Sequence, residues 1–176
     1  KEQYASSIDF SHNQGNNVYD LSGSPTSQDF ANQVINLKGR VNLNSDLALH
    51  ARLSQFKDDI VQQDAPDYVK NTTQEAEAYA QWQATSHNRI LAGVSHKNLT
   101  ADVLSITEWS SVDYDESTRS TGYFLQHQYQ TEKLNTQVGI RLEDHEKFGS
   151  HTVGQLAARY FFTPILQKST QNQPNF

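Results

Sequence analysis

The chain has 176 residues, which is enough for one all-β domain, and nothing in its length demands a second one. Its net charge is -6, its isoelectric point is about 5.6, and no basic stripe runs along it, so we expect no nucleic-acid partner. The chain contains no cysteine, which removes disulfides, thiol catalysis and thiolate zinc sites from consideration. No run of about 20 apolar residues occurs, so we expect no membrane-spanning helix.

Hydropathy narrows the fold class further. Hydrophobic residues make up 35% of the chain and the mean hydropathy is -0.74, which is low for a domain that must fill a two-layer core. The aromatic content of 10% nevertheless argues against disorder. These values fit strands with one apolar and one polar face, as in a membrane barrel with a polar interior. A soluble β-barrel with long polar loops is the alternative.

Alternation of apolar and polar residues predicts about eight strands. The segment 75–84 is rich in Ala, Glu and Gln and has helical propensity, but ten residues of alternation favour a strand there. The alternation changes parity between Val94 and Leu99, so we expect a bulge or a turn at residues 96–98. In chain order the expected strands are 4–10, 33–43, 47–54, 76–84, 90–94 with 99–103, 121–130, 134–143 and 152–162.

The connections between these strands alternate in length. Polar, Gly-containing segments predict long loops, whereas the intervening connections are short turns. Alternate connections of an antiparallel meander lie at the same end, so the long loops would share one rim, as in outer-membrane barrels. We therefore predict an all-β, antiparallel up-and-down transmembrane β-barrel over residues 1–166, complete or a sector of a larger barrel, and an irregular tail at 167–176. The expected loops are 11–28, 57–73, 105–119 and 144–150.

Ligand recognition is one function that the loops could serve, although a solubilising loop is the commoner interpretation. Asp113, Tyr114 and Asp115 are the candidate ligand-binding residues, because an aromatic side chain among polar loop residues is a common recognition device. A purely solubilising acidic loop is the alternative. No nucleophile elbow, phosphate loop or zinc motif is present, so we expect no enzyme and no catalytic residue.

Metal binding has weaker candidates. His145 and His151 flank a turn and could hold a metal, although solvated loop histidines are commoner. We expect no resident metal or cofactor, with calcium in the acidic loop 57–73 as the one exception to test. The carboxylates of that loop have no EF-hand spacing, which favours a solvated loop; they are Asp58, Asp59, Asp64 and Asp67.

Several motifs occur together in residues 119–151. They are an Arg-, Asp- or Asn-rich loop, a Thr-Gly strand, a hairpin, an Arg-Asp strand ending and a Phe-Gly pair, and the strand segments Tyr79–Trp82 and Ala92–Val94 accompany them. This pattern resembles the middle of the barrel of TonB-dependent outer-membrane receptors, and among these it is most similar to the cobalamin receptor. The resemblance covers about half of the chain.

The resemblance implies a location and a function. The protein would be a transport receptor in the bacterial outer membrane, surrounded by outer-membrane lipid, that takes up a scarce nutrient, expected to be cobalamin or a related corrinoid. TonB would energise uptake through a plug domain that this chain lacks. Because such barrels have about 22 strands, we expect the chain to be a fragment, a set of pieces or a reduced barrel. The alternative is a small β-barrel binding or structural protein without its own transport cycle.

Overall fold

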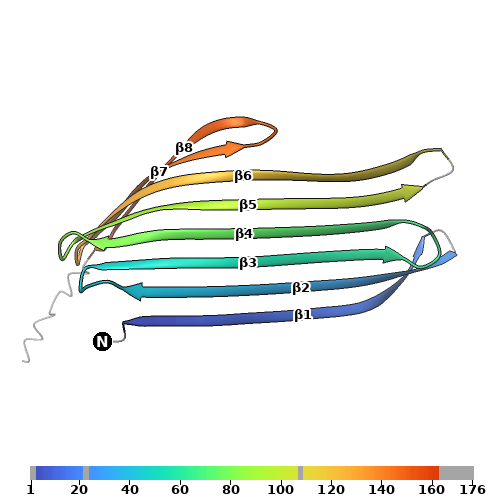
Figure 1. Ribbon diagram of the computed structural model, residues 1–176, viewed down its shortest axis with the longest axis horizontal. Coiled ribbons are helices and arrows are strands. Elements are labelled where there is room, and N and C mark those ends of the chain that lie inside the picture. The colour runs from blue at the N-terminus through green and yellow to red at the C-terminus, as the bar shows by residue number, and fades with distance from the viewer. Residues whose placement is uncertain (1–2, 22–23, 107–108, 163–176) are drawn as a thin grey trace, which may run out of the picture.

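The computed structural model describes residues 3–21, 24–106 and 109–162, which form one sheet of eight long strands (Figure 1). The expected tail at 167–176 lies outside the described residues. Within the described ranges no helix is long and apolar enough to cross a membrane. The strands are β1 Tyr4–Leu21, β2 Ser24–Asn42, β3 Leu47–Gln62, β4 Tyr68–Gln83, β5 Asn88–Ile106, β6 Ser111–Gln130, β7 Leu134–His145 and β8 Gly149–Tyr160.

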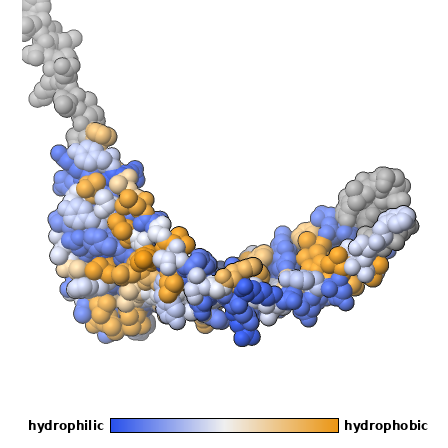
Figure 2. Space-filling view, turned by 90° about the horizontal axis from the view of Figure 1, so that it is seen from above, coloured by the Kyte–Doolittle hydropathy of each residue, from blue (hydrophilic) through white to orange (hydrophobic). Residues whose placement is uncertain are grey.

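Each strand pairs antiparallel with the next one in the chain, in the order β1 to β8. The prediction of an all-β, up-and-down arrangement of about eight strands is thereby confirmed. In the described part of the chain β1 and β8 do not pair with each other, so both are edges of an open sheet. Figure 2 shows that this sheet is curved rather than flat. The described strands therefore form an arc of wall and not a closed eight-stranded barrel.

Continuous pairing gives the sheet two distinct faces. Residues directly opposite each other on antiparallel strands point to the same side. One row crosses all eight strands and is almost wholly apolar; it contains Tyr4, Val41, Leu49, Ala80, Ala92, Leu125, Ile140 and Gly154. We call this side the outer face. The opposite, inner face contains Ala48 and Ser95, which are each only 4% exposed, so the inner face is the hollow side of the curve.

Three side chains build the short turns. Asn44 Oδ1 accepts hydrogen bonds from the backbone N–H groups of Asp46 and Leu47, each at 2.8 Å. Thr85 Oγ1 and Thr131 Oγ1 accept backbone N–H groups in the same way. Such local acceptors replace ladder hydrogen bonds where the chain reverses. The rim that holds these turns, at 43–46, 84–87 and 131–133, is here called the short-turn rim, and the opposite one the extended rim.

Three of the expected long loops are strands instead. Most of residues 11–28 belong to β1 and β2, residues 57–62 and 68–73 extend β3 and β4, and 111–119 begin β6. The loop expected at 144–150 shrinks to 146–148, where Gly149 adopts a left-handed φ of 72°. Polar composition suggested loops, but a polar strand is stable when strands on both sides extend with it and pair its backbone groups. The predicted asymmetry between the rims thus appears as strand extension.

The bulge expected at residues 96–98 is also absent from the described strand. β5 pairs one-to-one with β4 and with β6 through His96, Lys97 and Asn98. The backbone therefore keeps its parity, and the apolar side chains change sides instead. Val94 lies on the outer face, whereas Leu99 and Val103 lie on the inner face.

Candidate functional site

The middle of the inner face holds a polar network centred on Arg141. Its Nη2 donates to Ser95 Oγ at 2.9 Å, and its Nε donates to Glu143 Oε2 at 2.7 Å. The guanidinium lies over Gly122, where a Cβ would collide with it. Because Ser95 lies on β5 and Arg141 on β7, the network joins strands that are not neighbours.

Aromatic rings flank this network. The ring of Tyr79 stacks on His50 with centroids 4.5 Å apart and planes 3° from parallel. Tyr79 also packs against Phe124, at 6.3 Å between ring centroids. Both rings close over Gly93, where a Cβ would lie 2.5 Å from the Tyr79 Cβ and 2.7 Å from Phe124 Cζ. The glycine therefore lets two aromatic side chains meet on the inner wall.

Further towards the extended rim, the inner face becomes apolar. One row of paired residues carries an apolar or aromatic side chain on each of five adjacent strands, β2 to β6. On β1 the row has Gly15, which is covered by the ring of Phe30 from β2. A second set of apolar residues lies two inner-face rows closer to the short-turn rim. The two sets together are called the inner apolar strip. Most are half-buried, while Phe56 and Tyr114 are 42% and 45% exposed. The strip comprises Phe30, Ile60, Val69, Val103 and Tyr114, with Val34, Phe56 and Leu99.

A polar row separates the two parts of this strip. It brings three amides and two carboxylates onto the same face, so hydrogen-bonding groups lie between apolar ones. The arrangement can bind a molecule that has an apolar body and polar groups at its edge. The row consists of Asn13, Asn32, Asp58, Asn71, Ala101 and Glu116.

The candidate residues Asp113, Tyr114 and Asp115 do not converge. They lie in β6 rather than in a loop, so successive side chains point to opposite faces. Tyr114 belongs to the inner apolar strip, beside Val103. Asp113 and Asp115 are on the outer face, where Asp115 pairs with Asp102. Whether any of the three binds a ligand stays a prediction, and the geometry separates the tyrosine from the two carboxylates.

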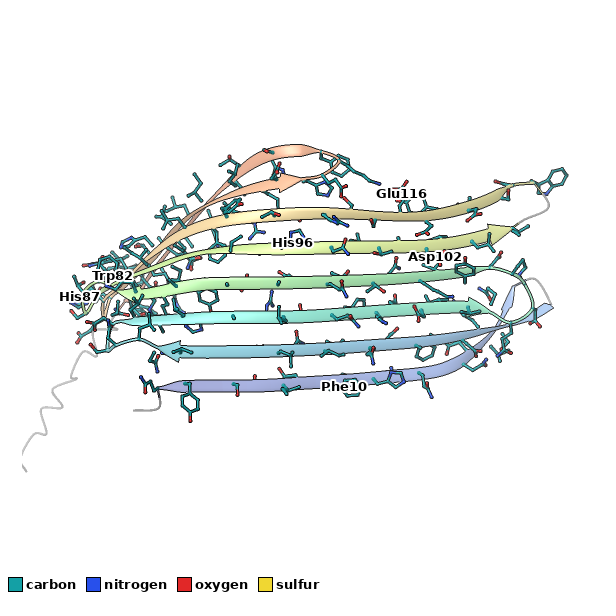
Figure 3. The ribbon with its side chains drawn as sticks, in the orientation of Figure 1. Phe10, Trp82, His87, His96, Asp102 and Glu116 are labelled. Carbon is teal, nitrogen blue, oxygen red and sulfur yellow. The ribbon has the colours of Figure 1, made fainter. Side chains whose placement is uncertain are left out.

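The carboxylates on the outer face of the extended half raise the pKa of a neighbouring tyrosine. The pKa of Tyr68 is raised above its ordinary value, first by a side-chain hydrogen bond to Asp102, then by burial and by the negative charges of Asp102, Asp113 and Asp115. Lys70 lies over the same ring, with its Nζ 4.7 Å from the centroid. Figure 3 shows Asp102 and Glu116 in the extended half and Trp82 and His87 at the short-turn rim.

The carboxylates considered for calcium are also dispersed. Asp64 Oδ2 accepts the backbone N–H of Ser27, and Asp67 Oδ1 accepts that of Ile106. Asp58 and Asp59 are consecutive in β3 and face opposite sides. Among the described residues no group of three or more His, Asp or Glu side chains is placed to hold a metal ion. Calcium binding stays a prediction without an assembled ligand set.

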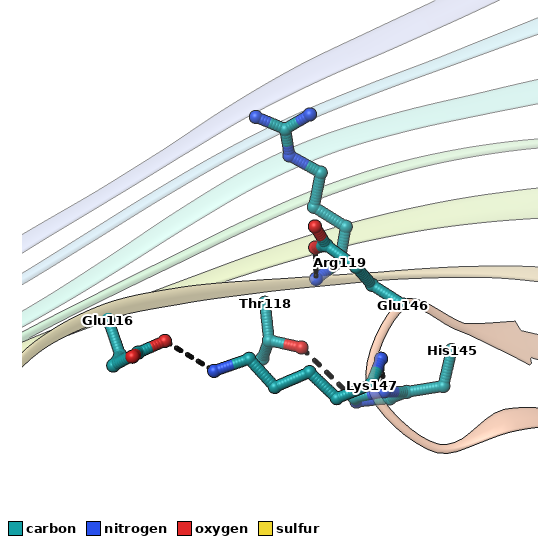
Figure 4. A network of polar contacts seen from close by, with 6 residues as sticks. All are labelled: Glu116, Thr118, Arg119, His145, Glu146 and Lys147. Carbon is teal, nitrogen blue, oxygen red and sulfur yellow. Dashed lines mark hydrogen bonds and ion pairs between the residues drawn. The ribbon is translucent and has the colours of Figure 1, made fainter.

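The β7–β8 turn is fastened to the extended part of β6 (Figure 4). Lys147 Nζ forms an ion pair with Glu116, which raises the pKa of that lysine, and Glu146 Oε2 accepts the backbone N–H of Arg119 at 3.2 Å. His145 Nδ1 accepts the backbone N–H of Lys147 at 3.2 Å. These contacts use Nδ1 of His145 to shape the turn, and metal binding by His145 and His151 stays a prediction.

A family comparison agrees with this architecture. The family described as TonB dependent receptor-like, beta-barrel matches residues 2–169, nearly the whole chain. The chain belongs to the TonB-dependent receptor β-barrel family. It is therefore an outer-membrane β-barrel protein of the bacterial type, as the resemblance implied. No curated protein sequence matches the chain.

The chain is similar to two solved structures of low sequence identity. One is the translocator domain of the autotransporter NalP from Neisseria meningitidis, with a TM-score of 0.47 and 12% identity over 90% of this chain; our chain spans 60% of that domain. The other is Ail, the attachment invasion locus protein of Yersinia pestis, with a TM-score of 0.39 and 16% identity. That match covers 91% of this chain and 99% of Ail. These similarities concern the fold alone.

Sequence reasoning missed the inner apolar strip. The parity change between Val94 and Leu99 was the available signal, because an alternation that switches sides without a Gly or Pro can mean a change of environment along one strand. Ile60 and Val69 lay in a segment expected to be a loop, and Phe30 lay between an expected loop and an expected strand, so alternation was not considered there.

Proposed function

We propose that this chain forms part of the wall of a transport receptor that captures a scarce nutrient at the inner face of its extended half. The observation that supports this most is the inner apolar strip, which gathers apolar side chains of five adjacent strands on the inner face of the extended half. Contiguous exposed apolar patches usually mark binding surfaces. The inner apolar strip is thus a surface for a molecule that arrives from water.

Cobalamin or a related corrinoid is the nutrient that we propose. A corrinoid has a broad, largely apolar macrocycle with amide side chains around its edge. The two parts of the strip offer contact to the macrocycle, and the amides of Asn13, Asn32 and Asn71 can exchange hydrogen bonds with its side chains. We further propose that TonB energises uptake through a plug domain packed against the Arg141 network.

Binding of labelled cobalamin to the purified receptor tests the proposal. Ile60 and Val61 are consecutive aliphatic residues of β3 that face opposite sides. We expect Ile60→Asn, in the inner apolar strip, to weaken binding about tenfold or more, because desolvated apolar contact is lost. The matched variant Val61→Asn, on the outer face, should bind as the unaltered protein does. Equal effects of the two variants, or no binding of cobalamin at all, would contradict the proposal.

Uptake separates transport from simple binding. Cells that produce the receptor should accumulate labelled cobalamin, and collapse of the proton gradient should stop accumulation while leaving surface binding intact. Surface binding without energised uptake would instead support a binding barrel that has no transport cycle.

A further inference from the structure

The outer face holds a hollow at the upper border of its apolar band, on the side of the extended rim. The hollow is an open groove with a volume of about 610 Å³. Its lower part is apolar, with Leu37 on β2, Leu53 on β3 and Ala76 on β4. It forms because the small Ala76 stands between two larger side chains, Leu53 and His96, in the same row. Lower down, a second hollow of about 690 Å³ includes Ala78 and Ala80 and is almost entirely apolar.

The upper part of the hollow is polar and cationic. The row above Ala76 contains Gln74, Asn98 and Arg119 on three successive strands. In Figure 4 the side chain of Arg119 points away from Thr118 and Lys147, which lie on the other side of the strand. Its guanidinium has no carboxylate within ion-pair distance in the described part of the chain.

Two further groups have unused hydrogen-bonding capacity. Asn98 Oδ1 is buried and has no hydrogen-bond partner among the described residues. His96 uses Nδ1 in a 3.0 Å hydrogen bond with Thr121 Oγ1, which leaves its Nε2 directed elsewhere. Because Asn98 Oδ1 is an acceptor, a ligand could satisfy it only with a donor such as a hydroxyl group, so the phosphate contacts of this hollow rest on Arg119 and His96.

We propose that this hollow binds a membrane lipid with a phosphate-bearing headgroup. Its acyl chain would run along Ala76, Ala78 and Ala80, and its phosphate would accept hydrogen bonds from Arg119 and His96. Arginine suits this role because its planar donors match phosphate oxygens and it is weakly hydrated. The position also fits, since the border between apolar and polar side chains is where a lipid headgroup meets a barrel wall. The site is separate from nutrient capture, which uses the inner face.

Native mass spectrometry of the detergent-solubilised protein tests this site with two probes that differ only in the phosphate. One is a phosphatidic acid, and the other is a diacylglycerol with the same acyl chains. We expect the protein to retain the phosphatidic acid and to lose the diacylglycerol. The variant Arg119→Gln should retain about tenfold less phosphatidic acid than the unaltered protein, which is the typical effect of losing a charge-assisted hydrogen bond.

Three controls make the outcome decisive. Lys97→Gln removes one positive charge next to Asn98 on the same strand but on the inner face, and it should leave lipid retention unchanged. Arg119→Lys should restore part of the retention lost in Arg119→Gln. Glycerol phosphate, which has the headgroup without chains, should not displace the lipid. Equal retention of both lipids, equal effects of Arg119→Gln and Lys97→Gln, or displacement by glycerol phosphate would overturn the proposal.

Discussion

Arg141 on β7 donates a hydrogen bond to Ser95 on β5 at 2.9 Å, and it reaches that partner by crossing over Gly122 of β6. A Cβ at position 122 would occupy the space of the guanidinium. We therefore predict that Gly122→Ala displaces Arg141 and lowers the free energy of unfolding by about 1 kcal/mol, the scale of one hydrogen bond of a half-exposed charged group. Urea unfolding in lipid vesicles, followed by tryptophan fluorescence, measures the change.

Gly39 offers the control for this substitution. A Cβ built there meets nothing within 4 Å, so Gly39→Ala should leave the free energy of unfolding within about 0.5 kcal/mol of the unaltered protein. If both variants unfold at the same urea concentration, the Arg141–Ser95 contact contributes nothing to stability.

Gly93 should be less tolerant than Gly122. A Cβ at position 93 would lie 2.6 Å from the backbone oxygen of Ala78, as well as 2.7 Å from Phe124 Cζ. The backbone at Ala78 cannot move aside, whereas the end of the Arg141 side chain beside Gly122 can. We therefore predict that Gly93→Ala lowers the free energy of unfolding by about 1–3 kcal/mol, as over-packing typically does. The same urea experiment checks the order of the two variants. A Gly93→Ala variant as stable as Gly39→Ala would show that the rings move away freely.

The apolar band of the outer face makes its own prediction. Ile140 on β7 is 55% exposed in the protein alone and lies in the row that crosses all eight strands. We predict that Ile140→Arg costs about 2–4 kcal/mol in vesicles, because a charge on the lipid face of a barrel is most costly near the bilayer midplane. Gln137→Arg places the same charge on the inner face of that strand and should cost far less. Equal costs would contradict the assignment of the two faces.

Tyr68 gives a prediction that depends on pH. Its pKa is raised, so the folded state holds the phenol proton more tightly than the unfolded state does. This contribution to stability is complete below the unfolded pKa and is lost as the pH rises through the folded pKa. We predict that Asp102→Asn lowers the ionisation midpoint of Tyr68, measured by NMR of labelled tyrosine. Asp115→Asn should lower it less, because Asp115 acts by charge alone; a midpoint that neither variant moves would exclude the Asp102 hydrogen bond.

The strand pattern of the membrane band could be predicted from sequence, and the extended half could not. Within the band one face must contact lipid and the other must not, so Leu134 to Leu142 alternate strictly and their faces were assigned correctly. Beyond the band both faces meet water, and Asn16, Asp29 and Asp59 then resemble loop residues. Their pairing depends on neighbours far away in sequence, such as the Asn16 side chain that donates to Asp29 at 2.8 Å.

The candidate site was predictable only in part. Tyr114 was singled out as an aromatic among acids, and its two neighbours were grouped with it because a loop was expected. In a strand the period of two separates them, which places Tyr114 beside Val103 and Asp113 on the other face. The Arg141 network could not be predicted in full, because the partner Ser95 lies 46 positions away in the sequence and carries no local signal.

The central claim is that one continuous strand exposes apolar side chains to lipid in its lower half and to the interior in its upper half. Because the sequence contains no cysteine, single cysteines can be placed along β5 from Ala92 to Val103, spin-labelled, and tested for collision with oxygen and with a water-soluble nickel complex in vesicles. We predict that oxygen reaches labels at positions 92 and 94 far more than labels at positions 93 and 95. From position 98 onwards, the nickel complex should reach labels on both faces of the sheet. The assignment of successive labels to opposite faces should continue without a break through 96–98. Lipid exposure of position 99 or 103, or a break in alternation at 96–98, would contradict the claim.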